Sequence, residues 1–186
     1  MKLVAVVILI ACMLSGCNSE DVLLKQATDL RKTILEADSC TFQTVITADY
    51  GDRLYTFQMD CTTDNAGNLE FIVTDPETIC GITGTISQKS SALTFEDKVL
   101  AFPMLTDDQL TPVSTPWIFI NTLRSGYIVG CSKTDEEICI YIDDSYEENP
   151  LRLEVYTDTH MNPMHADIFC NQQRILSADI RNFTIQ

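Results

Sequence analysis

Apolar and polar residues alternate along most of this chain, and no other feature constrains its fold as strongly. In residues 54–60, Tyr55, Phe57 and Met59 alternate with polar residues, and residues 69–73 repeat the pattern. Successive side chains of a β-strand point to opposite faces, so this alternation predicts strands with one apolar and one polar face. Polar turns separate the segments. The sequence predicts one antiparallel meander over residues 38–102 and further strands over residues 138–185.

Two segments have helical spacing instead. In residues 18–38, apolar residues recur every three or four positions, and acidic residues fall in the first turn, where the helix dipole favours them. Thr111-Pro112 and Thr115-Pro116 are start signals for a second helix, and Gly126 is a stop signal. One face of this second helix would carry Trp117, Ile120, Leu123 and Tyr127.

The N-terminus has the pattern of an export signal. Lys2 precedes an apolar run that ends in Leu14-Ser15-Gly16-Cys17. This ending resembles the bacterial lipobox, whose cysteine is acylated, for example with palmitate, and becomes the first residue of the mature protein. The run is shorter than the about 20 residues of a membrane span. We predict a signal peptide at residues 1–16 and one domain at residues 17–186. The alternative is an ordinary cleaved signal that happens to contain a cysteine.

The predicted location is the extracytoplasmic face of the cell membrane or outer membrane, with Cys17 as the lipid anchor. The chain has a formal net charge of −15, which disfavours nucleic acids and anionic headgroups as partners. Attachment to the membrane is therefore expected to depend on the acyl chains. The sequence leaves the oligomeric state open.

Six cysteines follow Cys17, and an even number in an exported chain suggests disulfides. If a hairpin turn centres between Tyr50 and Gly51, Cys40 faces Cys61. Cys131 and Cys139 flank a second polar turn, which leaves Cys80 and Cys170 for a long-range bridge. The alternative is six separately buried thiols.

Several segments together resemble the LolA/LolB family of bacterial lipoprotein carriers and acceptors. They are Ser39-Cys40-Thr41-Phe42, the Gly67-Asn68-Leu69-Glu70-Phe71-Ile72-Val73 strand, Pro76, the Trp117 helix and Asn162-Pro163-Met164. The resemblance implies an α+β, mainly β fold: a curved antiparallel sheet forming an incomplete barrel, with two main helices covering its concave face. Family carriers are soluble, whereas this chain has an anchor signal, so the lipoprotein-relay role is not carried over.

The resemblance also implies a hydrophobic ligand, such as a lipid, an acyl chain or a lipoprotein, bound between sheet and helices. An apolar cavity there is consistent with where small ligands bind. The alternative is an envelope interaction or sensor module with a filled core and no small-molecule ligand. The candidate cavity residues are Phe42, Ile46, Tyr55, Phe57, Met59, Leu69, Phe71, Phe95, Trp117, Ile120 and Leu123.

No motif in the sequence carries enzymatic chemistry, and we predict no catalytic residue, no cofactor and no metal. The segment from His160 to His165 contains two methionines and would suit copper, but Asn162-Pro163 favours a plain turn. Paired carboxylates could serve in glycoside hydrolysis, yet each pair lies in a turn or at a strand end, where solvated charge is normal. These pairs are Asp107-Asp108, Glu136-Glu137, Asp143-Asp144 and Glu147-Glu148.

Overall fold

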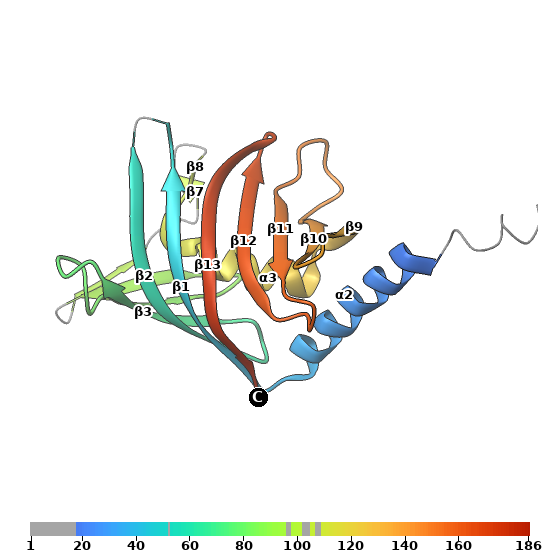
Figure 1. Ribbon diagram of the computed structural model, residues 1–186. Helices are drawn as coiled ribbons and strands as arrows, with labels where there is room; N and C mark the ends of the chain where they lie inside the picture. Colours follow the sequence, from blue (N-terminus) through green and yellow to red (C-terminus); the bar gives the residue numbers. More distant parts are fainter. Residues whose placement is uncertain (1–17, 52, 96–97, 102–104, 107–108) are drawn as a thin grey trace, which may run out of the picture.

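The computed structural model describes residues 18–51, 53–95, 98–101, 105–106 and 109–186. The predicted signal peptide and Cys17 lie outside these residues. The chain forms an eleven-stranded antiparallel sheet in the order β6-β5-β4-β3-β2-β1-β13-β12-β11-β10-β9, with two α-helices (Figure 1). Strands β6 and β9 are the two edges of the sheet and do not pair with each other, so the barrel is incomplete. The predicted fold class is confirmed.

The elements follow one another in a simple order. Helix α2 is Asn18–Glu36. The first meander comprises β1 Ser39–Asp49, β2 Leu54–Asp64, β3 Leu69–Asp75, β4 Thr83–Ile86, β5 Ser91–Phe95 and β6 Lys98–Ala101. The short strands β7 Leu105–Thr106 and β8 Gln109–Leu110, the 3-10 turn Pro112–Ser114 and helix α3 Thr115–Ser125 follow. The second meander comprises β9 Tyr127–Lys133, β10 Ile138–Asp143, β11 Arg152–Thr157, β12 Pro163–Cys170 and β13 Gln173–Ile185.

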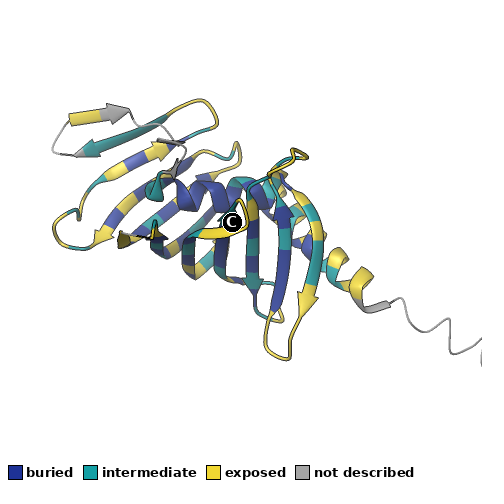
Figure 2. Cartoon of the chain, turned by 90° about the horizontal axis from the view of Figure 1, so that it is seen from above, coloured by how far each residue is buried: buried dark blue, intermediate teal, exposed yellow. Residues whose placement is uncertain are grey.

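The alternation in the sequence becomes an alternation in burial. Along β1 every second residue from Cys40 to Ala48 is buried, and β3 repeats the pattern. Figure 2 shows the resulting bands of buried and exposed residues along the strands. Most of the buried residues face the helices, and neither of the two described α-helices lies on the opposite face, which we call the helix-free face.

The helices cover one face of the sheet. Ala27, Leu30 and Ile34 of α2 belong to the same buried cluster as the inward side chains of the strands, and so do five residues of α3: Trp117, Ile118, Phe119, Ile120 and Leu123. Helix α3 begins after a 3-10 turn, with Pro116 in its first turn, where the missing N–H costs no helical bond. It ends at Gly126, whose N–H donates to the carbonyl of Thr122. Within the described residues, no helix is both long and apolar enough to span a bilayer.

Two details of the sequence prediction are wrong. The β1–β2 hairpin is shifted, because the N–H of Tyr50 donates to the carbonyl of Arg53 and the turn therefore centres one residue later than expected. Tyr127 does not continue the face of α3. It begins the edge strand β9, because Gly126 leaves the helix in an extended conformation.

Candidate binding surfaces of the sheet

The predicted cavity between sheet and helices is filled. Nine of its eleven proposed side chains are at most 7% exposed: Phe42, Ile46, Phe57, Met59, Leu69, Phe71, Trp117, Ile120 and Leu123. All nine belong to one packed cluster. A side chain beside a space large enough for a ligand would keep surface accessible to a water-sized sphere, so these values indicate a packed core.

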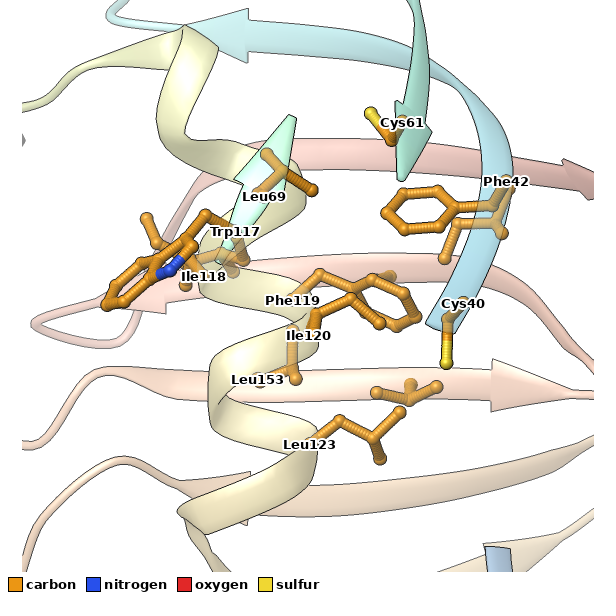
Figure 3. Packing of buried hydrophobic residues seen from close by; sticks show 14 of the residues in the cluster. Cys40, Phe42, Cys61, Leu69, Trp117, Ile118, Phe119, Ile120, Leu123 and Leu153 are labelled. Atoms are coloured by element: carbon orange, nitrogen blue, oxygen red, sulfur yellow. The ribbon is translucent and has the colours of Figure 1, made fainter. Parts of the chain in front are cut away.

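We call the layer of side chains between the sheet and the helices the seam. Aromatic rings fill its centre. Phe119 of α3 meets Phe42 of β1 edge-to-face, with ring centroids 5.7 Å apart, and lies 6.2 Å from the ring of Phe183. Figure 3 shows Phe119 and Phe42 meeting between the helix and the strand. Phe119 was not among the predicted cavity residues, although it is 1% exposed and its ring packs against both Phe42 and Phe183.

The other two proposed cavity residues do not line the seam. Tyr55 is 44% exposed, because it lies near the tip of the β1–β2 hairpin beyond the reach of the helices, where its ring meets Tyr50. Its assignment to the cavity is wrong. The side chain of Phe95 lies outside the part of the chain that the structure describes.

The six described cysteines are free thiols, which contradicts the three predicted disulfides. The shifted register places Cys40 opposite Thr63 and Cys61 opposite Phe42. Figure 3 shows Phe42 between the two cysteines. Both remain on the helix-covered face, where burial raises the pKa of the Cys61 thiol and keeps it protonated.

The other two predicted disulfides, Cys131–Cys139 and Cys80–Cys170, are absent for different reasons. Cys131 pairs with the inward-facing Ile140, whereas Cys139 pairs with Ser132 and points to the other face. Burial raises the pKa of Cys139 to about 11. Cys80 lies in the β3–β4 turn and Cys170 at the end of β12, and four strand spacings separate these strands, about 19 Å.

A wide hollow lies on the helix-free face of the sheet, at the outward side chains of β13, β1, β2, β3, β4 and β5. It is open to solvent and has a volume of about 750 Å³. We call it the outer groove. It lies where β3 to β6 turn away from the long strands β1 and β2 (Figure 1). Its outward-facing lining residues are Thr41, Gln43, Asp60, Thr62, Glu70, Ile72, Thr83, Thr85, Thr94, Asn182 and Thr184.

A chain of hydrogen bonds organises one end of the outer groove. The amide of Asn182 donates to the side-chain oxygen of Gln43 at 2.9 Å, and the amide of Gln43 donates to Asp60 at 3.0 Å. The hydroxyls of Thr41 and Thr184 lie 3.2 Å apart. This end of the groove is therefore ordered by polar contacts between β13, β1 and β2.

A second polar cluster occupies the same face over β12 and β13. The imidazole of His165 lies between two carboxylates: Nδ1 is 2.7 Å from Asp179 and Nε2 is 3.1 Å from Asp167. Arg174 donates to the other oxygen of Asp167 at 3.3 Å. The hydrogen bond with Asp167, followed by that with Asp179, raises the pKa of His165 despite partial burial. Burial opposes ionisation of Asp167, but the bond with His165 lowers the pKa of that carboxyl below its usual value.

The cluster also contains a serine. The hydroxyl of Ser177 lies 3.3 Å from Nε2 of His165, so Ser177, His165 and Asp179 are ordered as in a hydrolytic triad. However, Nε2 is closer to Asp167, and two carboxylates favour the charged imidazolium, which cannot accept the serine proton. The geometry therefore supports a structural ion cluster. Sequence reasoning missed it, because the partners lie on two strands and the histidine had been assigned to a turn.

The segment from His160 to His165 does not form one site. His160 lies in an exposed turn organised by Asp158, whereas His165 belongs to β12, and Met161 packs against the core. Over the described ranges, no three histidine, cysteine or acidic side chains are arranged to hold a metal ion. Of the acidic pairs, Asp107-Asp108 lies outside the described residues, and Asp143 forms a bidentate ion pair with Arg152.

A smaller hollow of about 440 Å³ borders the seam at the end of α2. It includes Leu35 of α2, the β2–β3 and β4–β5 turns, and Trp117 and Arg124 of α3. The indole N–H of Trp117 donates to the carbonyl of Gly67 at 3.2 Å, and Arg124 donates to that of Asn65 at 2.6 Å. These bonds fasten the β2–β3 turn to the helix, so Trp117 forms a wall of the hollow and a part of the core.

Comparison with known proteins gives a likeness of fold. No protein-family model and no curated sequence matches the chain. A LolA superfamily protein from Nitrosomonas europaea superposes with a TM-score of 0.49 at 8% identity, covering 90% of this chain and 93% of that one. The lipoprotein LppX from Mycobacterium tuberculosis gives 0.43 at 12% identity, covering 87% and 93%. A putative outer membrane lipoprotein-sorting protein domain from Vibrio parahaemolyticus gives 0.44 at 9% identity, covering 87% and 91%.

Proposed function

We propose that this protein is a lipid-anchored module of the bacterial cell envelope that recognises a partner through its surface and does not enclose a lipid. The filled seam carries this proposal, because the apolar side chains that would line a lipid cavity contact one another instead. The anchor is part of the proposal and rests on the Leu14-Ser15-Gly16-Cys17 pattern. The charged state favoured at His165 argues against a hydrolytic role for the Ser177–His165 pair.

A second candidate function is binding of a hydrophobic ligand after the helices move. The hollow beside Trp117 favours it, since this hollow opens at the end of the seam and its volume of about 440 Å³ lies within the about 300–1,000 Å³ of small-ligand sites. To pass from this hollow into the filled seam, a lipid would have to displace buried side chains such as Leu69 or Leu123. That displacement removes packing contacts before any new contact forms.

Lipid analysis of the native protein distinguishes the two functions. The protein is extracted from membranes in mild detergent, and its bound lipids are identified by mass spectrometry. The surface-recognition proposal predicts acyl chains covalently attached at Cys17 and no lipid in stoichiometric complex. A non-covalent lipid that survives exchange into fresh detergent would contradict it and support the second candidate.

The anchor is tested separately. Cys17→Ala removes the acylated thiol and should move the protein from the membrane fraction to the soluble extracytoplasmic fraction. Cys80→Ala, which removes an exposed thiol from a turn, is the matched control and should stay membrane-bound. Equal membrane association of the two variants would refute the anchor.

A further inference from the structure

The outward side chains of the outer groove form two rows that cross the sheet. Thr184, Thr41, Thr62, Glu70 and Thr85 are successive cross-strand partners, and so are Gln43, Asp60, Ile72, Thr83 and Thr94. Each row spans five strands, about 19 Å at the usual strand spacing. The rows provide a repeating series of polar groups that an extended molecule could follow.

The chemistry of these rows excludes several ligand classes. Glu70 and Asp60 place negative charge in the groove, and no lysine, arginine or histidine is among its described lining residues. Phosphates and other anions are therefore disfavoured. Acyl chains are disfavoured as well, because burying unpaired hydroxyls and carboxylates against hydrocarbon is costly.

Four hydroxyls of the groove are available to a ligand. In the described part of the chain, Thr62, Thr83, Thr85 and Thr94 have no side-chain hydrogen bond, and Glu70 has no ion pair. A hydroxyl both donates and accepts hydrogen bonds, while a carboxylate accepts two or more. Threonine methyl groups and Ile72, which is 40% exposed, add small apolar contacts between the polar groups.

We propose that the outer groove binds a neutral oligosaccharide segment of a polyhydroxylated envelope polymer. The ring hydroxyls of such a chain match an alternation of hydroxyl, amide and carboxylate groups, and its C–H faces match the methyl groups. A peptide fits less well, because the backbone groups of these strands already pair within the sheet and cannot bind a peptide backbone. The assignment rests on the proposed function, since it names the ligand class for surface recognition.

Calorimetric titration of the full acylated chain in mild detergent tests this assignment. The probe is a soluble hexamer of N-acetylglucosamine, and a lysine-rich peptide of similar length is the second arm. The wild type should bind the hexamer saturably. Thr62→Arg places a bulky side chain at the centre of the first row and should weaken binding at least about tenfold. Thr56→Arg, on the same strand and face but outside the groove, should match the wild type.

Thr85→Arg is a second groove variant in case Thr62→Arg does not fold, which circular dichroism shows. Absence of hexamer binding to the wild type would overturn the assignment, as would equal weakening by Thr62→Arg and Thr56→Arg. Binding of the peptide in place of the hexamer would overturn it in favour of a cationic partner. Each of these outcomes leaves the filled seam intact, so failure of the groove assignment is distinct from failure of the proposed function, which a lipid held in the seam would show.

Discussion

The two faces of the same sheet differ in what their side chains do. On the helix-covered face, apolar residues from both helices and most of the strands form one packed cluster. On the helix-free face, threonines, amides and carboxylates border a groove that is open to solvent, and His165 lies among charged partners. The apolar side chains of the covered face pack against one another, so they offer no surface to a partner. The polar face carries hydrogen-bonding groups that a partner can still reach. Recognition is therefore expected on the polar face.

Truncating one aromatic ring on the packed face should have the largest effect. Phe119→Ala removes a ring that is 1% exposed and contacts two other phenylalanines, so it should lower the free energy of unfolding by about 3–5 kcal/mol. Ile72→Ala, on the helix-free face, should cost less than about 1 kcal/mol. Chemical denaturation measures both. Similar costs for the two variants would remove the distinction between the faces.

Two strand glycines provide a smaller, matched test. A Cβ at Gly84 would overlap the ring of Phe71 and lie 2.9 Å from the carbonyl oxygen of Ala92, whereas one at Gly130 would meet nothing closer than 3.9 Å. Gly84→Ala should therefore destabilise the protein by about 1–3 kcal/mol. Gly130→Ala should be neutral or slightly stabilising, since alanine has less conformational freedom in the unfolded chain. A tolerated Gly84→Ala would mean that the core beside β3 and β4 is looser than described.

The charged cluster on the helix-free face predicts a modest dependence of stability on pH. The pKa of His165 is raised in the folded state, so its contribution is fully present below its ordinary pKa of about 6.5 and is lost as the pH rises through the raised value. His165→Gln should lower stability by about 1 kcal/mol at pH 6 and by less at high pH. Thermal unfolding of the wild type and of His165→Gln, measured from pH 6 upward, checks this difference in stability. A constant difference between the two proteins would show that protonation of His165 is not involved.

The fold could be predicted because its main signals are local. Alternation defined the strands. Of the two predicted start signals, Thr111-Pro112 precedes a 3-10 turn and Thr115-Pro116 begins α3, which ends at the predicted Gly126. The hairpin register was harder, since the polar turn at residues 49–52 allows two centres. Moving the centre of the turn by one residue shifts the cross-strand partner of every residue by two positions. Cys40 and Cys61 therefore remain on the predicted face but are no longer opposite each other.

The state of the seam and the polar sites could not be predicted in the same way. An apolar stripe indicates which side chains are buried, but not whether space remains between them once Phe119 and Phe42 meet. The His165 cluster combines residues of β12 and β13. The outer groove combines β13 with β1 to β5, and strands so distant in sequence meet only after the sheet has assembled.

The central claim is that the seam contains no space for a ligand, and xenon binding tests it most directly. Xenon enters dry apolar cavities, including engineered ones of about 150 Å³. In methyl-labelled protein under xenon pressure, the methyl resonances of Met59, Ile120 and Leu123, all fully buried, should not show saturable shifts. Saturable shifts at these three residues would reveal a cavity between sheet and helices and contradict the account.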